Sequence, residues 1–296
     1  MERIKGYSAI FIMYGVAFFI AWLTYLALPE WSMIAKILIA DIAATLTIYL
    51  FSVLFNNASI YDPYWSVAPM VIVPFFVERL NVETLLMVGV LFFWGIRLTV
   101  NWAITFTGFH HEDWRYRYFK TRFPKLWPLV NLFGIHLMPT IVVYVALIPA
   151  ILYVSAGGTI GLLTLLGAFM AIGATLIQWS ADRTLHAFKR EERRKAVCKE
   201  GLWKYSRHPN YFGEILMWSG VFVMLLGVAP EYYLSIFGPL LMVTLFTTIS
   251  IPLMEKRQLE NKPEYGHYVE TTHALIPVPF RQKNVSNEES DETFQE

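Results

Sequence analysis

Residues 201–228 read GLWKYSRHPNYFGEILMWSGVFVMLLGV, a polar and basic stretch that runs directly into an apolar segment. Pro209 suits the first turn of a helix, because its missing N–H would have no partner there. Ser206 or His208 would cap that helix. The helix would begin beside Arg207 with free N–H groups and the positive end of its dipole, which together make a natural anion site. A charged collar at lipid headgroups is the alternative interpretation.

The chain as a whole is too apolar to be a water-soluble domain. Of its 296 residues 56% are hydrophobic and only 16% are charged, whereas soluble domains have roughly 25% charged residues. The net charge of +1 excludes a strongly basic nucleic-acid binder, so we expect no nucleic-acid partner. The single cysteine, Cys198, excludes a disulfide framework and a multi-cysteine metal site. The composition predicts an integral membrane protein.

Eight segments are candidates for crossing a membrane, which requires roughly 20 apolar residues. The first follows Arg3 and Lys5, and we interpret it as an anchor rather than a signal peptide. The third is short and carries Pro69 and Pro74, which favours a re-entrant or kinked segment. We therefore predict an all-α membrane bundle of seven or eight transmembrane helices. The segments lie near 8–28, 33–55, 64–78, 83–106, 129–153, 159–180, 211–228 and 233–253.

The basic residues between these segments predict the orientation. Basic residues gather in 107–127, which has five, in 181–209, which has nine, and in the tail after 254. The connections at 29–32, 154–158 and 229–232 have no Lys or Arg. Eight crossings with both termini in the cytoplasm place every basic loop inside.

Polar residues in the C-terminal half indicate a binding site. Asn210 and Glu214 are four residues apart and share one helix face. A carboxylate at that depth usually faces a cavity or a partner. Basic residues after the sixth segment would clamp phosphates or bind anionic lipid headgroups, and the cluster alone favours lipid. They are Lys189, Arg190, Arg193 and Arg194.

In the N-terminal half, Asp62 precedes Pro63 and would cap the third segment. Arg97 lies inside the fourth segment, where it needs a partner, and Asp41 or Asp62 would supply one. His136 is more typical of a hydrogen-bonded contact between helices. No zinc-ligand spacing occurs, so we predict no metal.

The segment Tyr205-Ser-Arg-His-Pro-Asn-Tyr-Phe-Gly-Glu214, with Trp218 one turn further on, resembles the steroid 5-alpha-reductase C-terminal-domain superfamily. The resemblance is closest to a bacterial branch labelled a domain of unknown function. It extends from Asp62-Pro-Tyr-Trp65 and Asp113-Trp-Arg-Tyr116 through Asp182 to Glu255-Lys-Arg257 and Leu275-Ile-Pro277, and covers roughly 60–280.

This resemblance implies a bundle with a cofactor cavity that faces the cytoplasm. It divides the chain into anchor helices (1–58), a catalytic bundle (59–280) and a disordered polar tail (281–296). In the reductases the cofactor is NADPH, and in related isoprenylcysteine carboxyl methyltransferases a similar motif binds S-adenosylmethionine. Asn after the proline and an acid after the glycine favour reduction. The matching cofactor positions are Asp182, Lys189, Asn210 and Glu214, with Arg207, His208 and Arg257 as further contacts.

The leading hypothesis is therefore NADPH-dependent reduction of a carbon–carbon double bond. Tyr64 would donate a hydrogen bond to the substrate carbonyl, oriented by Asp62 and supported by Arg97. The Gln-Glu pair of the steroid reductases is absent from the N-terminal half, so we expect a lipophilic enone or polyprenyl-like substrate rather than a steroid. The alternatives are methyl transfer to a lipid-borne acceptor and a non-catalytic membrane protein. The branch favours a bacterial or archaeal plasma membrane.

Overall fold

The computed structural model describes residues 2–190 and 196–279, whose regular structure is helical apart from one isolated bridge between Ser206 and His273. Six helices among these residues are long and apolar enough to cross a membrane. The chain is thus an integral multi-pass membrane protein, and the predicted all-α bundle is confirmed. The six are α1 (Glu2–Leu26), α2 (Met33–Leu54), α4 (Val82–Thr105), a continuous helix Trp127–Ala156, α8 (Leu162–Arg190) and a continuous helix Pro230–Asn261.

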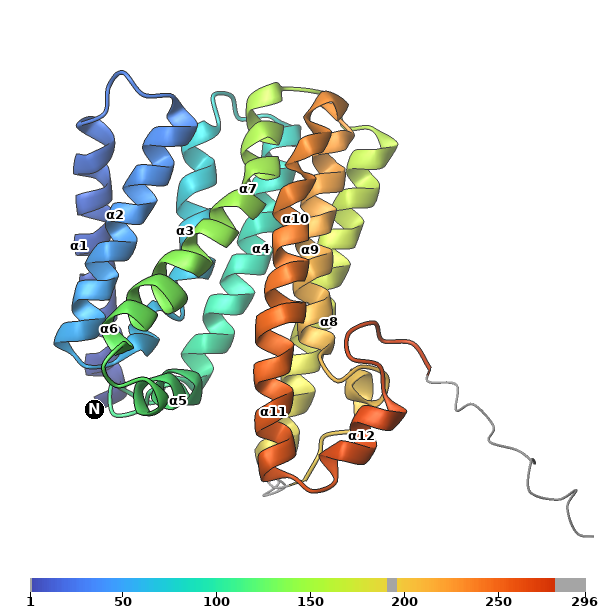
Figure 1. The fold of residues 1–296 in the computed structure, drawn as a ribbon. Helices are drawn as coiled ribbons and strands as arrows, with labels where there is room; N and C mark the ends of the chain where they lie inside the picture. Colours follow the sequence, from blue (N-terminus) through green and yellow to red (C-terminus); the bar gives the residue numbers. More distant parts are fainter. Residues whose placement is uncertain (1, 191–195, 280–296) are drawn as a thin grey trace, which may run out of the picture.

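Two shorter segments run beside these six, as Figure 1 shows. The third predicted segment forms α3 (Tyr64–Ile72) followed by a 3₁₀ turn, η2 (Val73–Phe76). Pro69 lies inside α3, which continues past it to Ile72, whereas Pro74, which lacks an N–H for the helical ladder, lies where the regular helix gives way to the 3₁₀ turn. The seventh forms α9 (Pro209–Leu226), which begins at Pro209 as predicted.

The two long continuous helices contain π turns. Trp127–Ala156 consists of α6 (Trp127–Leu129), the π segment η3 (Val130–Leu137) and α7 (Met138–Ala156). Pro230–Asn261 consists of η5 (Pro230–Ile236), α10 (Phe237–Leu245), the π segment η6 (Phe246–Ser250) and α11 (Ile251–Asn261). Each π segment ends just before a proline, Pro139 or Pro252, where a regular hydrogen bond cannot form.

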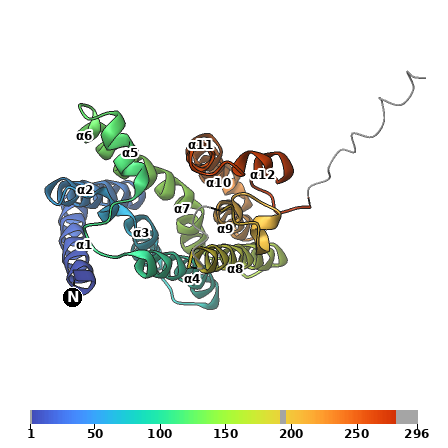
Figure 2. The same ribbon diagram turned by 90° about the horizontal axis from the view of Figure 1, so that it is seen from below.

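Short helices gather at one end of the bundle. The lower end in Figure 1 carries the start of α1 together with α5 (Trp114–Arg122) and α12 (Tyr265–Thr271). Two 3₁₀ turns, η1 (Ala58–Tyr61) and η4 (Gly201–Lys204), complete the described elements. The basic loops lie at this end, which is where the charge rule puts the cytoplasm. Seen from below in Figure 2, α1 and α2 lie at one side and α8 and α9 at the other, with α3, α4 and α7 between them.

Glycines bring α8 and α9 into close contact. A Cβ atom on Gly220 would lie 2.7 Å from the backbone of Ala171 and of Gly167, and one on Gly213 would lie 2.8 Å from the carbonyl of Ala174. Small residues at such positions let helix backbones approach closely inside a membrane. The contact fixes the start of α9 against the middle of α8.

The sixth predicted segment lies almost entirely within α8, whose helix continues beyond the apolar stretch to Arg190. Asp182 therefore lies inside this helix, where its charge is paired with Arg97. Further along, Phe188 is buried and packs in a small apolar cluster with Ala181 and Trp203. The main core contains Met13 of α1 as well as Trp218 of α9.

The predicted boundary at residue 58 falls at the start of η1, and the tail 281–296 lies outside the described residues.

Candidate functional site

A buried group of polar side chains, which we call the polar cluster, joins α4, α8 and α9. Arg97 on α4 donates a hydrogen bond to Oε1 of Gln178 at 2.6 Å and forms an ion pair with Asp182, both on α8. The amide of Asn210 on α9 donates to the other oxygen of Asp182 at 3.4 Å. The side chains of Arg97 and Asp182 are only 9% and 13% exposed. The ion pair is therefore largely withdrawn from water.

The polar cluster corrects the predicted partner of Arg97. We expected Asp41 or Asp62, but the partner is Asp182. The fourth segment, α4, packs against both α3 and α8, and Arg97 lies on the side that faces α8. The cluster thus brings Arg97, which we had placed near the substrate, next to two residues expected to bind the cofactor, Asp182 and Asn210.

Glu214 lies one turn after Asn210 and is enclosed by two tryptophans. Both carboxylate oxygens accept a hydrogen bond from Trp94 Nε1 at 3.1 Å, and Oε1 accepts one from Trp218 Nε1 at 2.9 Å. The two indole rings meet edge to face, with centroids 5.0 Å apart. These donors satisfy a carboxylate that is otherwise costly to bury. The sequence alone gave no indication that Trp94 belongs to this site.

The start of α9 is tied to the C-terminal segment. Arg207 Nε donates to Glu255 Oε1 at 2.7 Å, and His208 Nε2 lies 3.1 Å from the same oxygen. Arg207 also donates to the carbonyls of Val269, at 3.0 Å, and Thr272. Arg207 and His208 therefore hold α11 and α12 against the start of α9.

Neither predicted cap of α9 forms. His208 occupies the cap position but makes no side-chain capping bond. The hydroxyl of Ser206 accepts from the N–H of His208 at 3.1 Å and donates to the carbonyl of Leu275 at 2.7 Å. Ser206 lies too early in the chain to reach the first turn of α9, and it fastens the C-terminal segment instead.

Two other residues expected to bind the cofactor, Lys189 and Arg257, lie away from the polar cluster. Lys189 is exposed in the last turn of α8, seven residues after Asp182. The guanidinium of Arg257 on α11 stacks over the ring of Trp114, 4.1 Å from its centroid. Neither residue is joined to the polar cluster by a hydrogen bond among the described residues.

The predicted pairing of Asp62 with Tyr64 was wrong. The hydroxyl of Tyr64 donates to Oδ1 of Asp41 on α2 at 2.6 Å, whereas Asp62 accepts from the hydroxyl of Tyr116 on α5 at 2.5 Å. Positions i and i+2 at a helix start point to different sides. Asp62 also does not cap α3, whose cap residue is Pro63. Burial, with a smaller contribution from the nearby Asp113, raises the pKa of Asp62 to about 7.

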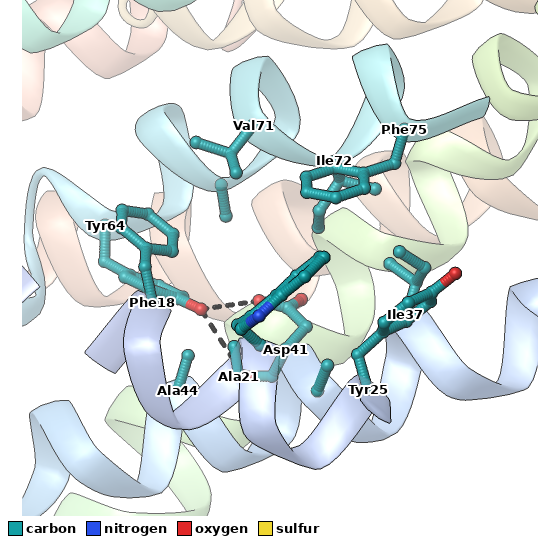
Figure 3. A pocket seen from close by; sticks show the side chains of 13 residues that line it. Phe18, Ala21, Tyr25, Ile37, Asp41, Ala44, Tyr64, Val71, Ile72 and Phe75 are labelled. Atoms are coloured by element: carbon teal, nitrogen blue, oxygen red, sulfur yellow. Dashed lines mark hydrogen bonds between the residues drawn. The ribbon is translucent and has the colours of Figure 1, made fainter. Parts of the chain in front are cut away.

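Tyr64 and Asp41 lie at an apolar pocket of about 110 Å³ between α1, α2 and α3. Figure 3 shows the Tyr64 hydroxyl directed at Asp41, with Phe18, Ile72 and Phe75 around the space. Trp22 and Phe75 both line the pocket and are 45% exposed. We call this space the Tyr64 pocket; it combines one hydroxyl–carboxyl pair with walls of apolar and aromatic side chains.

A second cavity, of about 520 Å³, lies between α4 and α8 beside Arg97 and Asp182. Close to it, two buried donors have no acceptor among the described residues: Nε of Arg97 and Nε2 of Gln178. Gln178 was missed by the sequence analysis. Its only signal there is that it precedes Asp182 by four residues and so shares its helix face.

The fold and site define a class: a multi-pass helical membrane protein with a charged cluster buried between helices and a separate apolar pocket that contains a tyrosine–carboxyl pair. Within the described residues no group of three His, Cys, Asp or Glu side chains is placed to hold a metal ion. The chain belongs to a family of proteins of unknown function, DUF1295, whose model matches residues 48–272. No curated protein and no solved structure matches the chain.

Proposed function

We propose that this protein is a membrane-embedded, NADPH-dependent reductase of a carbon–carbon double bond in a lipophilic enone or polyprenyl-like lipid. The observation that carries the proposal is the hydrogen-bonded pair of Tyr64 and Asp41, 2.6 Å apart, in an apolar pocket inside the membrane bundle. A lipophilic molecule with one oxygen at its tip matches such a pocket. The resemblance of residues 205–214 to the steroid 5-alpha-reductase superfamily supports the same chemistry.

The pair suits the charge change of this reaction. Reduction of an enone adds a hydride at the β carbon, and negative charge then develops on the carbonyl oxygen. A hydroxyl fixed in a low-dielectric pocket stabilises that charge more strongly than one in water. The single hydroxyl hydrogen of Tyr64 bonds Asp41 in the structure, so the step requires a protonated Asp41. Asp41 would donate its proton to the phenol oxygen while Tyr64 passes its own proton to the carbonyl oxygen, and Asp41 would then take a new proton from water. The resulting enol returns to the ketone with a proton on the α carbon, so the net reaction takes up one hydride and one proton.

The polar cluster and its surroundings fit a nucleotide. NADPH, when bound, supplies the hydride. The unpaired donors of Arg97 and Gln178 require acceptor oxygens that the described chain does not supply, and a nucleotide carries such oxygens on its amide and phosphates. Residues that would hold it are those of the cluster and its neighbours, Asp182, Asn210 and Glu214, with the cations Lys189, Arg207 and Arg257 and the imidazole of His208 toward the end that carries the basic loops.

The pocket and the cluster are linked by aromatic side chains. Trp65 follows Tyr64 on α3, and its ring lies 6.0 Å, centroid to centroid, from Trp94. Trp94 is in turn bonded to Glu214. In our proposal the lipid and the nucleotide meet beside this ring contact, the lipid arriving from the bilayer and the nucleotide from the cytoplasm.

Thermal unfolding of the detergent-purified protein with NADPH, NADH or S-adenosylmethionine tests the proposal. A ligand at a hundred times its dissociation constant adds about 2.7 kcal/mol to the free energy of unfolding. We expect this gain with NADPH, and we expect Asn210→Ala to remove it, since Asn210 bonds Asp182. Asn261→Ala is the matched control, because this amide bonds only the backbone of its own helix.

Each outcome decides between functions. Stabilisation by NADPH that is lost in Asn210→Ala and kept in Asn261→Ala supports the reductase. Stabilisation by S-adenosylmethionine but not by NADPH would replace it with methyl transfer. Stabilisation by none of the three would overturn both and favour a non-catalytic membrane protein.

A further inference from the structure

The larger cavity, between α4 and α8, has two chemically different walls. We call it the α4–α8 groove. The α4 wall has two polar members, Arg97 and Asn101, and is otherwise apolar, with apolar side chains that are 39% to 53% exposed on the outside of the bundle. They are Phe93, Ile96, Val100 and Ile104. In a membrane, exposed apolar side chains of a spanning helix face lipid. The groove is therefore open to the bilayer.

The α8 wall is cationic. Arg183, His186 and Arg190 recur at spacings of three and four residues, which puts them on one face of the helix. The two arginines carry the positive charge of this wall, and His186 adds an imidazole that can bond a phosphate oxygen. Within the described residues, Arg183 and Arg190 form no ion pair. Asp182 also lines the groove, but its charge is neutralised by Arg97. The groove thus presents uncompensated positive charge opposite an apolar surface.

The positions of these charges match a lipid at the membrane surface. The three residues lie in the last turns of α8, which runs toward the end that carries α12 and the basic loops (Figure 1). Trp179, one turn before Arg183, is 55% exposed and lines the same groove. Tryptophan is enriched at the level of the headgroups, and basic side chains near the surface attract anionic lipid.

We propose that the α4–α8 groove binds an anionic phospholipid of the membrane leaflet on that side. The lipid phosphate contacts Arg183, His186 and Arg190, and an acyl chain lies along Phe93, Ile96 and Val100. This site goes beyond the proposed reductase, because its lipid contacts lie on the outer face of the bundle and involve neither Tyr64 nor Asn210; it shares only the Arg97–Asp182 ion pair with the polar cluster. The occupant is a structural or regulatory lipid rather than the reactant.

Native mass spectrometry of the full-length protein in detergent tests the site. Phosphatidylglycerol and phosphatidylcholine with the same acyl chains are titrated separately, and the apparent dissociation constant of the first bound lipid is measured. We expect tighter binding of phosphatidylglycerol. Each cation contributes roughly fivefold in affinity, so the double variant Arg183→Gln with Arg190→Gln should weaken it about 25-fold.

Two further variants separate the groove from general charge effects. Val100→Trp fills the apolar wall without changing charge and should also weaken phosphatidylglycerol binding. Arg117→Gln with Arg122→Gln removes the same charge from exposed positions on α5 and should leave binding unchanged. A melting temperature within error of the wild type shows that each variant is folded.

Four results would overturn the proposal. The first two are equal affinity for the two lipids and undiminished phosphatidylglycerol binding by the Arg183/Arg190 double variant. The third is a loss of binding in the Arg117/Arg122 control as large as in that variant. The fourth is displacement of the lipid by millimolar inorganic phosphate, which would indicate a simple anion site. None of these readings depends on NADPH, so failure here leaves the reductase proposal to its own test.

Discussion

The ion pair between Arg97 and Asp182 should behave as a strongly coupled unit in a double-mutant cycle. The perturbations are Arg97→Met, which keeps an unbranched stem and removes the charge, Asp182→Asn, which keeps the shape of the side chain, and the two combined. The pair is largely buried, with side-chain exposures of 9% and 13%. Removing one member of such a pair leaves an uncompensated charge.

The expected losses follow from these contacts. Breaking a buried ion pair from one side costs about 3–5 kcal/mol, and Asp182 lines a cavity, which favours the lower end. Arg97→Met also removes the charged hydrogen bond to Gln178, for about 1.5 kcal/mol more. We expect a loss of about 4–5 kcal/mol for Arg97→Met and about 3 kcal/mol for Asp182→Asn. The double variant removes both charges of the pair and should lose at least about 2 kcal/mol less than the sum.

The assay is SDS-driven unfolding in mixed micelles, followed by the fluorescence of the ten tryptophans. The control is the exposed pair of His110 and Glu2, at 3.7 Å, whose side chains are 61% and 84% exposed. A cycle with His110→Gln and Glu2→Gln should show no measurable coupling. Losses at Arg97 and Asp182 that add within about 0.5 kcal/mol would refute the reasoning, because they would show that the two charges do not depend on each other.

Three further predictions concern packing, catalysis and pH. Gly220→Ala should push α9 away from α8 and lower the melting temperature sharply, because its Cβ would lie 2.7 Å from the backbone of α8. Gly173→Ala, with open space around it, should leave the melting temperature unchanged. Tyr64→Phe should lower NADPH oxidation with a panel of lipophilic enones at least about a hundredfold and leave stabilisation by NADPH intact. The pKa of Asp62, raised from 3.8 to about 7, means that the folded state holds its proton more tightly than the unfolded chain. The contribution of Asp62 to the free energy of unfolding is complete below about pH 4 and is lost as the pH rises through about 7. The melting temperature of the wild type should therefore fall as the pH is raised, and that of Asp62→Asn should fall less.

Specific results would contradict each of these. Equal melting temperatures for the two glycine variants would show that the α8–α9 contact is looser than the structure has it. Full activity in Tyr64→Phe would remove this hydroxyl from the chemistry. A parallel pH dependence in the wild type and in Asp62→Asn would mean that another group titrates in that range.

Much of the architecture follows from the sequence because its causes are local. A run of about 20 apolar residues has to form a helix in a bilayer, since no water is present to bond its backbone. Pro74 lies where the regular helix of the third segment ends, and Pro209 starts α9, because a ring without an N–H acts on its own turn. The gathering of the basic loops at one end is likewise visible in the charge count alone.

Pairing between helices required the tertiary structure. Helical periodicity shows that Asn210 and Glu214 share a face, but it does not show which helix that face meets. Arg97 meets Asp182 because glycines bring α9 onto α8 and α4 packs beside them. The two acids considered for Arg97 bind tyrosines instead: Asp41 binds Tyr64, and Asp62 binds Tyr116.

Asp182 on α8 shows the same difference between what local chemistry predicts and what the tertiary structure decides. The charge of Asp182 in the sequence indicates the end of an apolar segment, since an unpaired carboxylate is excluded from hydrocarbon. In the folded chain Arg97 neutralises this charge, and the helix continues to Arg190. Local chemistry therefore determined which segments enter the membrane, and only contacts between distant segments decided how the charge of Asp182 is neutralised and which side chains form the site.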